Sequence, residues 1–211
     1  MTPATSVKPY HHGDLRNALV EAGVELAREG GPAAIVLREA ARRVGVSPNA
    51  AYRHFDSLPA LVTAVAQRAL TDLAKAMQTE IRRCRPSGDE QADAWRTARA
   101  VGKAYVEFAL REQGLFQTAF DRRAHAAASD HIEPGAVSPQ DVLTERLEAL
   151  VAAGLLPAAD MAAARMLAWS SVHGLALLLL GPLEHLSRRE RKAMVEATLD
   201  QVGAGLLPGR T

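Results

Sequence analysis

Apolar residues recur along this chain at the spacing of amphipathic helices, and no alternating strand pattern persists anywhere. The first helix follows Asp14, which can cap its start, and the Gly-Gly-Pro run at 30–32 is expected to end it. Its apolar positions recur at i, i+4, i+7 and i+11: Leu15, Leu19, Ala22 and Leu26. The pattern therefore predicts a helix over residues 14–30.

The same spacing of apolar residues predicts six further helices of different lengths after residue 57. Gly114 is expected to break one of them, and the polar stretch 121–139 carries no helical pattern. The last helix opens with Ser187 and Glu190, a capping box in which each side chain accepts from a free N–H at the helix start, and Gly203 and Gly205 are expected to end it. The predicted helices are 58–83, with the stripe Leu61, Val65, Ala69 and Leu73, then 90–111, 115–120, 140–153, 158–180 and 187–202.

Residues 34–54 have the pattern of two short helices held at an angle by a tight turn. In the first, Ala40, Ala41 and Val44 share one face, and Gly45 can adopt the left-handed conformation that ends a helix. Ser47 and Pro48 suit the N-cap and first position of a second helix over 48–55. Ala51 and Phe55 are expected to face inward, which leaves four polar side chains outside: Asn49, Tyr52, Arg53 and His54. This is the arrangement of a DNA-binding helix-turn-helix.

The prediction is an all-α protein of about nine helices. Three form a head, one long helix connects, and five form a C-terminal bundle. We predict a DNA-binding domain over 11–71 and an effector-binding and dimerisation domain over 72–211. The boundary between them lies inside the long helix, which can transmit a rotation where a flexible linker would absorb it.

Charge and composition refine this picture. The 211 residues carry a net charge of only +1, but residues 38–54 hold four arginines and one glutamate, a local charge of +3 that suits a site-specific DNA binder. Cys84 is the only cysteine and the N-terminus has no apolar signal-peptide core, which together predict a cytoplasmic protein. The apolar stretch 166–183 is interrupted by polar residues and glycine, so we interpret it as a helix buried in a bundle or between subunits, not as a membrane span.

The chain resembles the TetR family of transcriptional regulators. The matching segments are residues 10–16 (YHHGDLR), 37–47 (LREAARRVGVS) and 51–55 (AYRHF), and residues 169–174 (WSSVHG) resemble the signature of a Trp-His-Gly (WHG) C-terminal subgroup. The resemblance implies a homodimer whose last two helices, about 158–180 and 187–202, form a four-helix bundle with their copies, and a body that binds a small-molecule effector. Two positions depart from the family. Val36 stands where the family often has Ser or Thr, and Leu58 stands where it often has Lys; both family residues are phosphate contacts.

The expected partner of the head is an operator in double-stranded DNA. Asn49 can pair bidentately with adenine, Arg53 can read guanine or hold a phosphate, and His54 can contact a phosphate or pack inward. Arg38 can replace the missing phosphate contacts, and free N–H groups near the start of the first helix favour anions. The complete set of predicted DNA-contacting residues is Tyr10, His11, Gly13, Arg38, Ser47, Pro48, Asn49, Ala50, Tyr52, Arg53 and His54.

Taken together, a few large side chains in the Ala-rich body can line an effector pocket, although any one of them alone is more typical of an ordinary core. His173 is the most informative, because a buried imidazole needs a partner: a ligand, Ser170 or a backbone carbonyl. The candidate pocket residues are Trp95, Tyr105, Phe108, Phe116, Phe120, Met166, Trp169 and His173.

The sequence favours a repressor that a small apolar ligand releases from a palindromic operator. A DNA-binding structural or interaction protein without an effector is the alternative. An enzyme is not expected, since no phosphate-binding glycine loop, nucleophile elbow or paired metal-ligand motif occurs. His11, His12 and Asp14 lack the further ligands of a metal site, so no metal or other cofactor is expected.

Overall fold

A computed structural model of the chain describes residues 12–122, 124, 127 and 137–206. All secondary-structure elements among these residues are helices, and no strand occurs among them, as the sequence predicts. The helices are α1 (His12–Gly30), α2 (Leu37–Val44), α3 (Pro48–Tyr52), α4 (Leu58–Arg83), α5 (Glu90–Arg111), α6 (Gln113–Ala119), α8 (Pro139–Ala152), α9 (Met161–Leu180) and α10 (Arg188–Leu206), with short 3-10 turns at Pro32–Ala34 and Ala158–Asp160.

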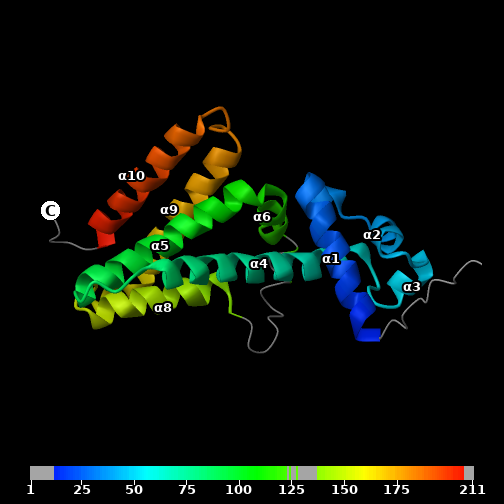
Figure 1. The fold of residues 1–211 in the computed structure, drawn as a ribbon, viewed down its shortest axis with the longest axis horizontal. Helices are drawn as coiled ribbons and strands as arrows, with labels where there is room; N and C mark the ends of the chain where they lie inside the picture. The colour runs from blue at the N-terminus through cyan, green and yellow to red at the C-terminus, as the bar shows by residue number, and fades with distance from the viewer. Residues whose placement is uncertain (1–11, 123, 125–126, 128–136, 207–211) are drawn as a thin grey trace, which may run out of the picture.

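The long helix α4 runs from the head into the body, as Figure 1 shows. Helix α1 crosses its N-terminal part, with α2 and α3 on the far side of α1, and α5 and α8 lie along the rest, with α9 and α10 packed against α5. Its predicted apolar stripe is confirmed, because Leu61, Val65, Ala69 and Leu73 are all fully buried. The first three of these residues belong to the core of the head, and Leu73 belongs to the core of the body. One continuous helix therefore contributes to both cores.

Helix α6 also belongs to both cores. Leu115 and Ala119 pack in the head core, whereas Phe116 packs in the body core and Phe120 is partly buried against both. The side chains alternate in this way because i and i+4 residues share a face of the helix. The head is thus joined to the body at two places, along α4 and through α6.

Several predicted helix ends are wrong. The first helix begins at or before His12, so Asp14 lies inside it and does not cap it. The break after α5 falls at Glu112, and Gly114 lies within α6 instead of interrupting it. Helix α10 continues through Gly203 and Gly205 to Leu206. A Cβ on Gly203 would lie 2.4 Å from the Trp95 ring, so close packing explains this glycine.

The capping signal at the last helix was a better guide than Asp14 was at the first. The Ser187 N–H donates to Glu190 at 2.8 Å and the Glu190 N–H donates to Ser187 Oγ at 3.3 Å, which confirms the predicted capping box. Ser138 and Asp141 form a second capping box at the start of α8, which the sequence reasoning missed although the Ser-x-x-Asp spacing was available.

Candidate nucleic-acid interface

The predicted helix-turn-helix is present as α2, a turn and α3. Gly45 has φ +77°, and its N–H donates to the carbonyls of Ala41 and Arg42, which ends α2. Ser47 Oγ then accepts the Ala50 N–H at 3.3 Å and caps α3. Helix α3 ends at Tyr52, three residues earlier than predicted, since Arg53 is its C-cap.

Helix α3 lies at the end of the head that is farthest from the body (Figure 1). Ala51 and Phe55 are buried, as predicted, and hold this short helix against the head. Ala50 and His54 are half-buried, so the two readings of His54 both fit its position. The exposed members of the predicted set are Arg38, Ser47, Pro48, Asn49, Tyr52 and Arg53.

The remaining predicted contacts lie near the start of the chain. Gly13 is in the first turn of α1. Tyr10 and His11 lie outside the described residues. Arg16, which the sequence reasoning did not select, places its guanidinium 5.1 Å from the centroid of the Phe55 ring. This cation–π contact brings one more cation beside the recognition helix, and no local sequence signal points to it.

The basic patch is smaller than the sequence count suggests. Arg43 forms an ion pair with Glu29 of α1 at 2.7 Å, and Arg42 pairs with Glu39 at 2.7 Å. Hydrogen bonds from Arg42 and then Arg43 lower the pKa of Glu39 to about 2, so this carboxylate stays charged at neutral pH. The charges of Arg42 and Arg43 are thus balanced by Glu39 and Glu29. Glu29 was not included in the charge count of residues 38–54.

Val36 and Leu58 stand where the resemblance led us to expect phosphate contacts. Val36 is the N-cap of α2 and its side chain makes no cap hydrogen bond, while Ser57 Oγ accepts the Ala60 N–H at the start of α4. The two apolar side chains are 46% and 42% exposed, respectively. Neither is part of a core, so both remain available at the surface of the head.

In the body, an aromatic cluster lies where α5, α6 and α9 meet. The Tyr105 hydroxyl and His173 Nδ1 are 2.8 Å apart, and the Phe120 ring lies 4.7 Å from the His173 ring and 4.8 Å from the Phe116 ring. Burial raises the pKa of Tyr105, and a hydrogen bond with Trp169 opposes part of this rise. Five of the eight predicted pocket residues therefore lie together: Tyr105, Phe116, Phe120, Trp169 and His173.

The structure does not bring the other three residues to this cluster's centre. Phe108 is buried in the body core, with the Arg111 guanidinium 5.8 Å from its ring. Trp95 packs against α10 near Gly203, and Met166 is 62% exposed on α9. Periodicity placed these side chains on helices but could not say which helix each would face.

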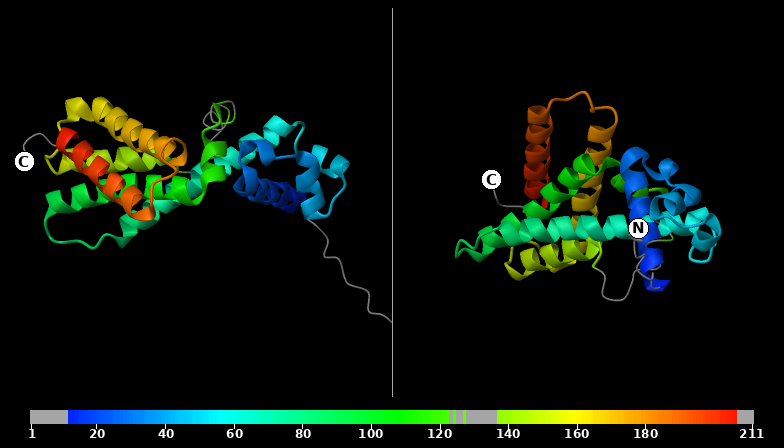
Figure 2. Two further views of the ribbon diagram at one scale, coloured as in Figure 1. Left: turned by 90° about the horizontal axis from the view of Figure 1, so that it is seen from above. Right: turned by 45° about the vertical axis from the view of Figure 1, so that its right-hand side comes forward.

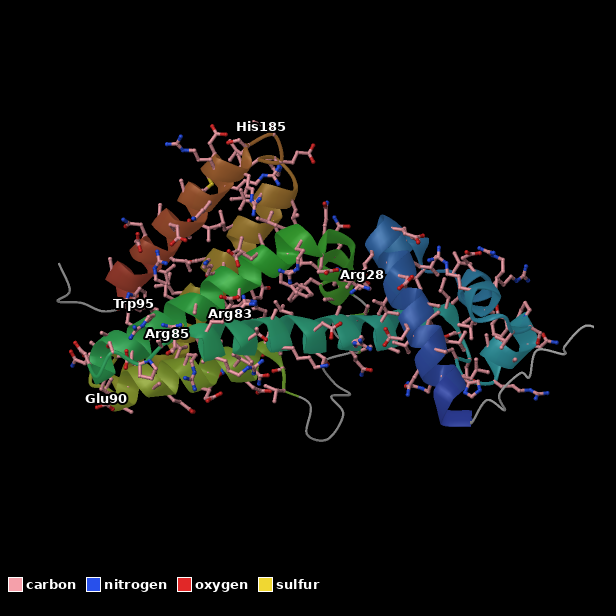
Figure 3. All side chains as sticks on the ribbon, viewed as in Figure 1. Arg28, Arg83, Arg85, Glu90, Trp95 and His185 are labelled. Atoms are coloured by element: carbon pink, nitrogen blue, oxygen red, sulfur yellow. The ribbon has the colours of Figure 1, made fainter. Side chains whose placement is uncertain are left out.

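The contact between α6 and α1 is unusually close. A Cβ added to Gly114 would lie 1.9 Å from the carbonyl oxygen of Ala27, so only glycine allows the two backbones to approach this far. Beside it, Arg28 Nε donates to Glu112 Oε2 at 2.9 Å. Figure 3 shows Arg28 on the side of α1 that faces α6. This junction links the aromatic cluster of the body to the first helix of the head.

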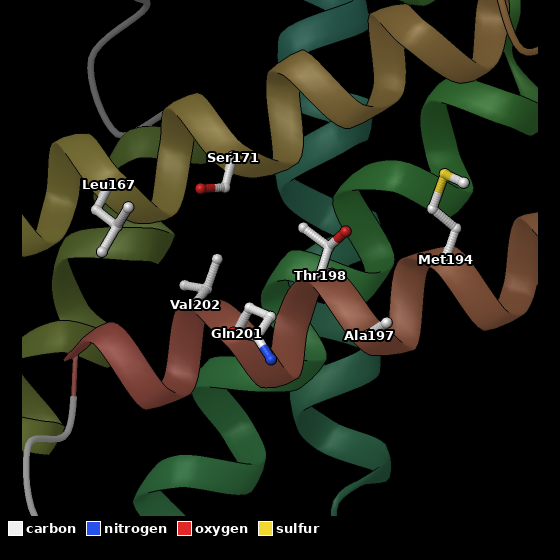
Figure 4. Close-up of a pocket in the computed structure, with 7 residues that line it drawn as sticks. All are labelled: Leu167, Ser171, Met194, Ala197, Thr198, Gln201 and Val202. Carbon is white, nitrogen blue, oxygen red and sulfur yellow. The ribbon is translucent and has the colours of Figure 1, made fainter.

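The last two helices form an antiparallel pair (Figure 2), and a groove lies between them (Figure 4). The groove has a volume of about 340 Å³. By length and composition, residues Ala158–Leu180 could cross a membrane, and 28% of the most apolar 18-residue window in it is buried within one chain. A single chain therefore buries the inner face of this apolar helix and leaves much of the rest uncovered. The groove is lined by Leu167, Ser171, Met194, Ala197, Thr198, Gln201 and Val202.

No group of three or more His, Cys, Asp or Glu side chains that could hold a metal ion occurs within the described ranges. His12 and Asp14 lie in the first turns of α1 and His11 lies before the part described. The metal prediction for this terminus therefore stays a prediction.

Two family models match the chain. One described as bacterial regulatory proteins, tetR family, matches residues 19–65, and one described as a tetracyclin repressor-like C-terminal domain matches residues 98–202. The first of these includes the whole of α2 and α3. No curated protein sequence gives a match.

Solved structures share the fold at low sequence identity. A protein with unknown function from Rhodococcus sp. RHA1 is 24% identical over 95% of this chain and 100% of its own, with a TM-score of 0.74. A bacterial regulatory protein in the tetR family from Rhodococcus RHA1 is 21% identical over 90% and 97%, with a TM-score of 0.56. The TetR family regulator PfmR from Thermus thermophilus is 18% identical over 89% and 98%, with a TM-score of 0.53.

Proposed function

The chain belongs to the TetR family of transcriptional regulators, and from this premise we propose that it is a homodimeric repressor that a small apolar ligand releases from a palindromic operator. The observation that carries the DNA-binding part is the exposed polar face of a capped recognition helix at the far end of the head. The protein acts by binding and not by catalysis.

On DNA, each subunit lays α3 in the major groove. Asn49 reads adenine from the N-terminal end of this helix, and Pro48 and Ala50 offer apolar contact, for instance to a thymine methyl group. The phosphate backbone of the DNA is contacted by Arg53, Tyr52, His54 and Ser47, and by Arg38 one turn into α2. Tyr10, His11 and Gly13 bring the start of α1 to the same backbone.

A second copy of the chain is proposed to cover the outer face of α9. Met166, Leu167, Leu177 and Leu178 are between 40% and 62% exposed there, which is unusual for large apolar side chains. Between them, a Cβ on Gly174 would meet no atom within 4 Å, so the middle of this face is open to close approach by another helix. The groove between α9 and α10 continues the same apolar surface, which supports a four-helix dimer interface.

The proposed ligand enters the aromatic cluster and acts through α6. Tyr105 and His173 offer a polar pair within aromatic walls, a combination typical of sites for small, largely apolar molecules. Displacing Phe116 or Phe120 would move α6, and α6 touches α1 at Gly114. A ligand that favours the moved arrangement would lower operator affinity by linkage.

One observation favours the second candidate, a DNA-binding structural or interaction protein of the same fold without an effector. The rings of Phe116, Phe120 and His173 contact one another at 4.7–5.6 Å between centroids, so these side chains themselves fill the space between them. A ligand must then displace at least one ring in order to bind.

The test begins with selection of duplexes from a random-sequence pool by the purified protein. An enriched inverted repeat is expected, and Arg53→Ala should weaken binding to it, with a shallower dependence of affinity on salt concentration if Arg53 holds a phosphate. Failure to enrich any sequence would reject the regulator proposal. A screen of apolar compounds for release of the enriched duplex then separates the two candidates, because only the effector-controlled protein will release it.

A further inference from the structure

An ion-pair network on α2 lies next to the proposed DNA-contacting surface. Glu39 Oε2 accepts from Arg42 Nε at 2.8 Å and Glu39 Oε1 accepts from Arg42 Nη2 at 2.7 Å, which is a two-pronged pair. The same oxygen Oε1 accepts from Arg43 Nε at 3.2 Å. One carboxylate therefore holds two neighbouring arginines.

The two arginines are placed differently. The Arg43 side chain is 26% exposed, and its Nη1 and Nη2 donate to Glu29 of α1 at 2.8 and 2.7 Å, so it ties α2 to α1. The Arg42 side chain is 73% exposed. Arg42 follows Arg38 by one turn and shares its face of α2. Arg42 is thus exposed enough to contact a partner outside the chain with its remaining donors, whereas Arg43 is tied to α1.

A glutamate at the position of Glu39 can also form a capping box with the N-cap residue, but Glu39 does not do so here. It is the third residue of α2, where a glutamate can pair with a Ser or Thr N-cap in a capping box. The N-cap here is Val36, which has no side-chain oxygen. The hydrogen bonds of the Glu39 carboxylate instead go to Arg42 and Arg43.

We propose that Glu39 is a positioning residue for DNA recognition, which fixes the Arg42 guanidinium with its outer edge turned toward a phosphate of the bound duplex. This inference rests on the proposed DNA-binding function. Because Nε and one proton of Nη2 are used by Glu39, the remaining donors lie on the outer side of the guanidinium, where a phosphate can accept two of them.

Glu39 acts on specific and non-specific complexes in different ways. Its negative charge repels phosphates wherever the protein sits on DNA, so it weakens both complexes. Its ordering of Arg42 helps only the specific complex, in which each phosphate contact has a fixed register. The physical consequence is a higher ratio of specific to non-specific affinity.

The experiment measures this ratio for Glu39→Gln. The probes are the duplex that the wild-type protein enriches from a random pool and an unselected duplex of equal length. The ratio should fall about threefold to tenfold per subunit, the usual effect of ordering one long side chain. Glu29→Gln is the matched control, because it removes an exposed carboxylate that holds only Arg43, and it should leave the ratio unchanged.

A second comparison shows whether Glu39 acts through Arg42. In an Arg42→Gln background, Glu39→Gln should have no further effect on the ratio. An unchanged or higher ratio for Glu39→Gln alone, or an equal fall in the Arg42→Gln background, would overturn the inference. If the wild-type protein enriches no duplex, the proposed function fails instead, and the two failures are thereby distinguished.

Discussion

Replacing Gly114 by alanine is the sharpest test of how the head is joined to the body. The new Cβ would lie 1.9 Å from the Ala27 carbonyl oxygen, 2.9 Å from the Ala27 carbonyl carbon and 3.2 Å from the Gly31 nitrogen. All three atoms belong to the backbone, so no side chain can rotate away to relieve the overlap. Helices α1 and α6 must therefore separate by roughly 1.5 Å to restore ordinary contact.

The magnitude follows from two opposing terms. Alanine is favoured over glycine inside a helix by about 0.5–1 kcal/mol, which would stabilise α6. Overpacking of a well-packed contact costs about 1–3 kcal/mol, and more where the backbone must move. The second term is larger here, so we expect the free energy of unfolding to fall by about 1–2 kcal/mol and operator binding to weaken, because both heads of the dimer change their angle.

Urea unfolding and DNA binding should be measured together, with Gly102→Ala as the control. That substitution also adds a methyl group to a helix, but its Cβ meets the flexible Leu199 side chain at 2.6 Å, inside the body. It should lower stability while leaving DNA affinity nearly unchanged. The reasoning is refuted if Gly114→Ala leaves both stability and DNA affinity at the wild-type values, or if the two variants affect DNA binding equally.

Three further predictions concern the recognition helix, the dimer and the aromatic cluster. Asn49→Ala should cost about 1–3 kcal/mol of base discrimination at one position of each half-site, and an unaltered preference profile from repeated selection would rule out direct readout. Leu177→Glu should convert the dimer to folded monomers in sedimentation measurements, because it buries an unpaired carboxylate in the interface. The control Leu58→Glu, on the head, should leave the dimer intact. A dimer that persists in Leu177→Glu would place the interface elsewhere. Since burial raises the pKa of Tyr105 above its ordinary value of 10.0, the folded state holds this proton more tightly than the unfolded state, and stability should fall more steeply above pH 10 in the wild type than in Tyr105→Phe; equal slopes in alkaline unfolding curves would contradict this.

The helix-turn-helix was predictable because every signal that builds it is local. The Ser47 cap, the left-handed Gly45 and the buried Ala51 all act within a few residues along the chain. The same holds for the long stripe of α4. The charge of the patch was not predictable, because Arg43 finds Glu29 on another helix, 14 residues away.

Glycines show where sequence reasoning reached its limit. Gly114 and Gly203 were both interpreted as helix breakers, which is what glycine does when only local propensity decides. In the folded chain both lie inside helices, and each position needs glycine because the Ala27 carbonyl or the Trp95 ring occupies the space of a side chain.

The sequence by itself determined that the chain is helical, where most of the helices lie, and that one short helix presents a polar surface suited to DNA. These properties follow from periodicity, caps and turns, whose interactions span a few residues. Only the tertiary structure decided that α6 joins the two cores, that Tyr105 meets His173 across 68 residues, and that Arg28 meets Glu112 across 84. Such contacts depend on how whole helices pack, and the spacing of residues along a chain does not specify which faces will meet.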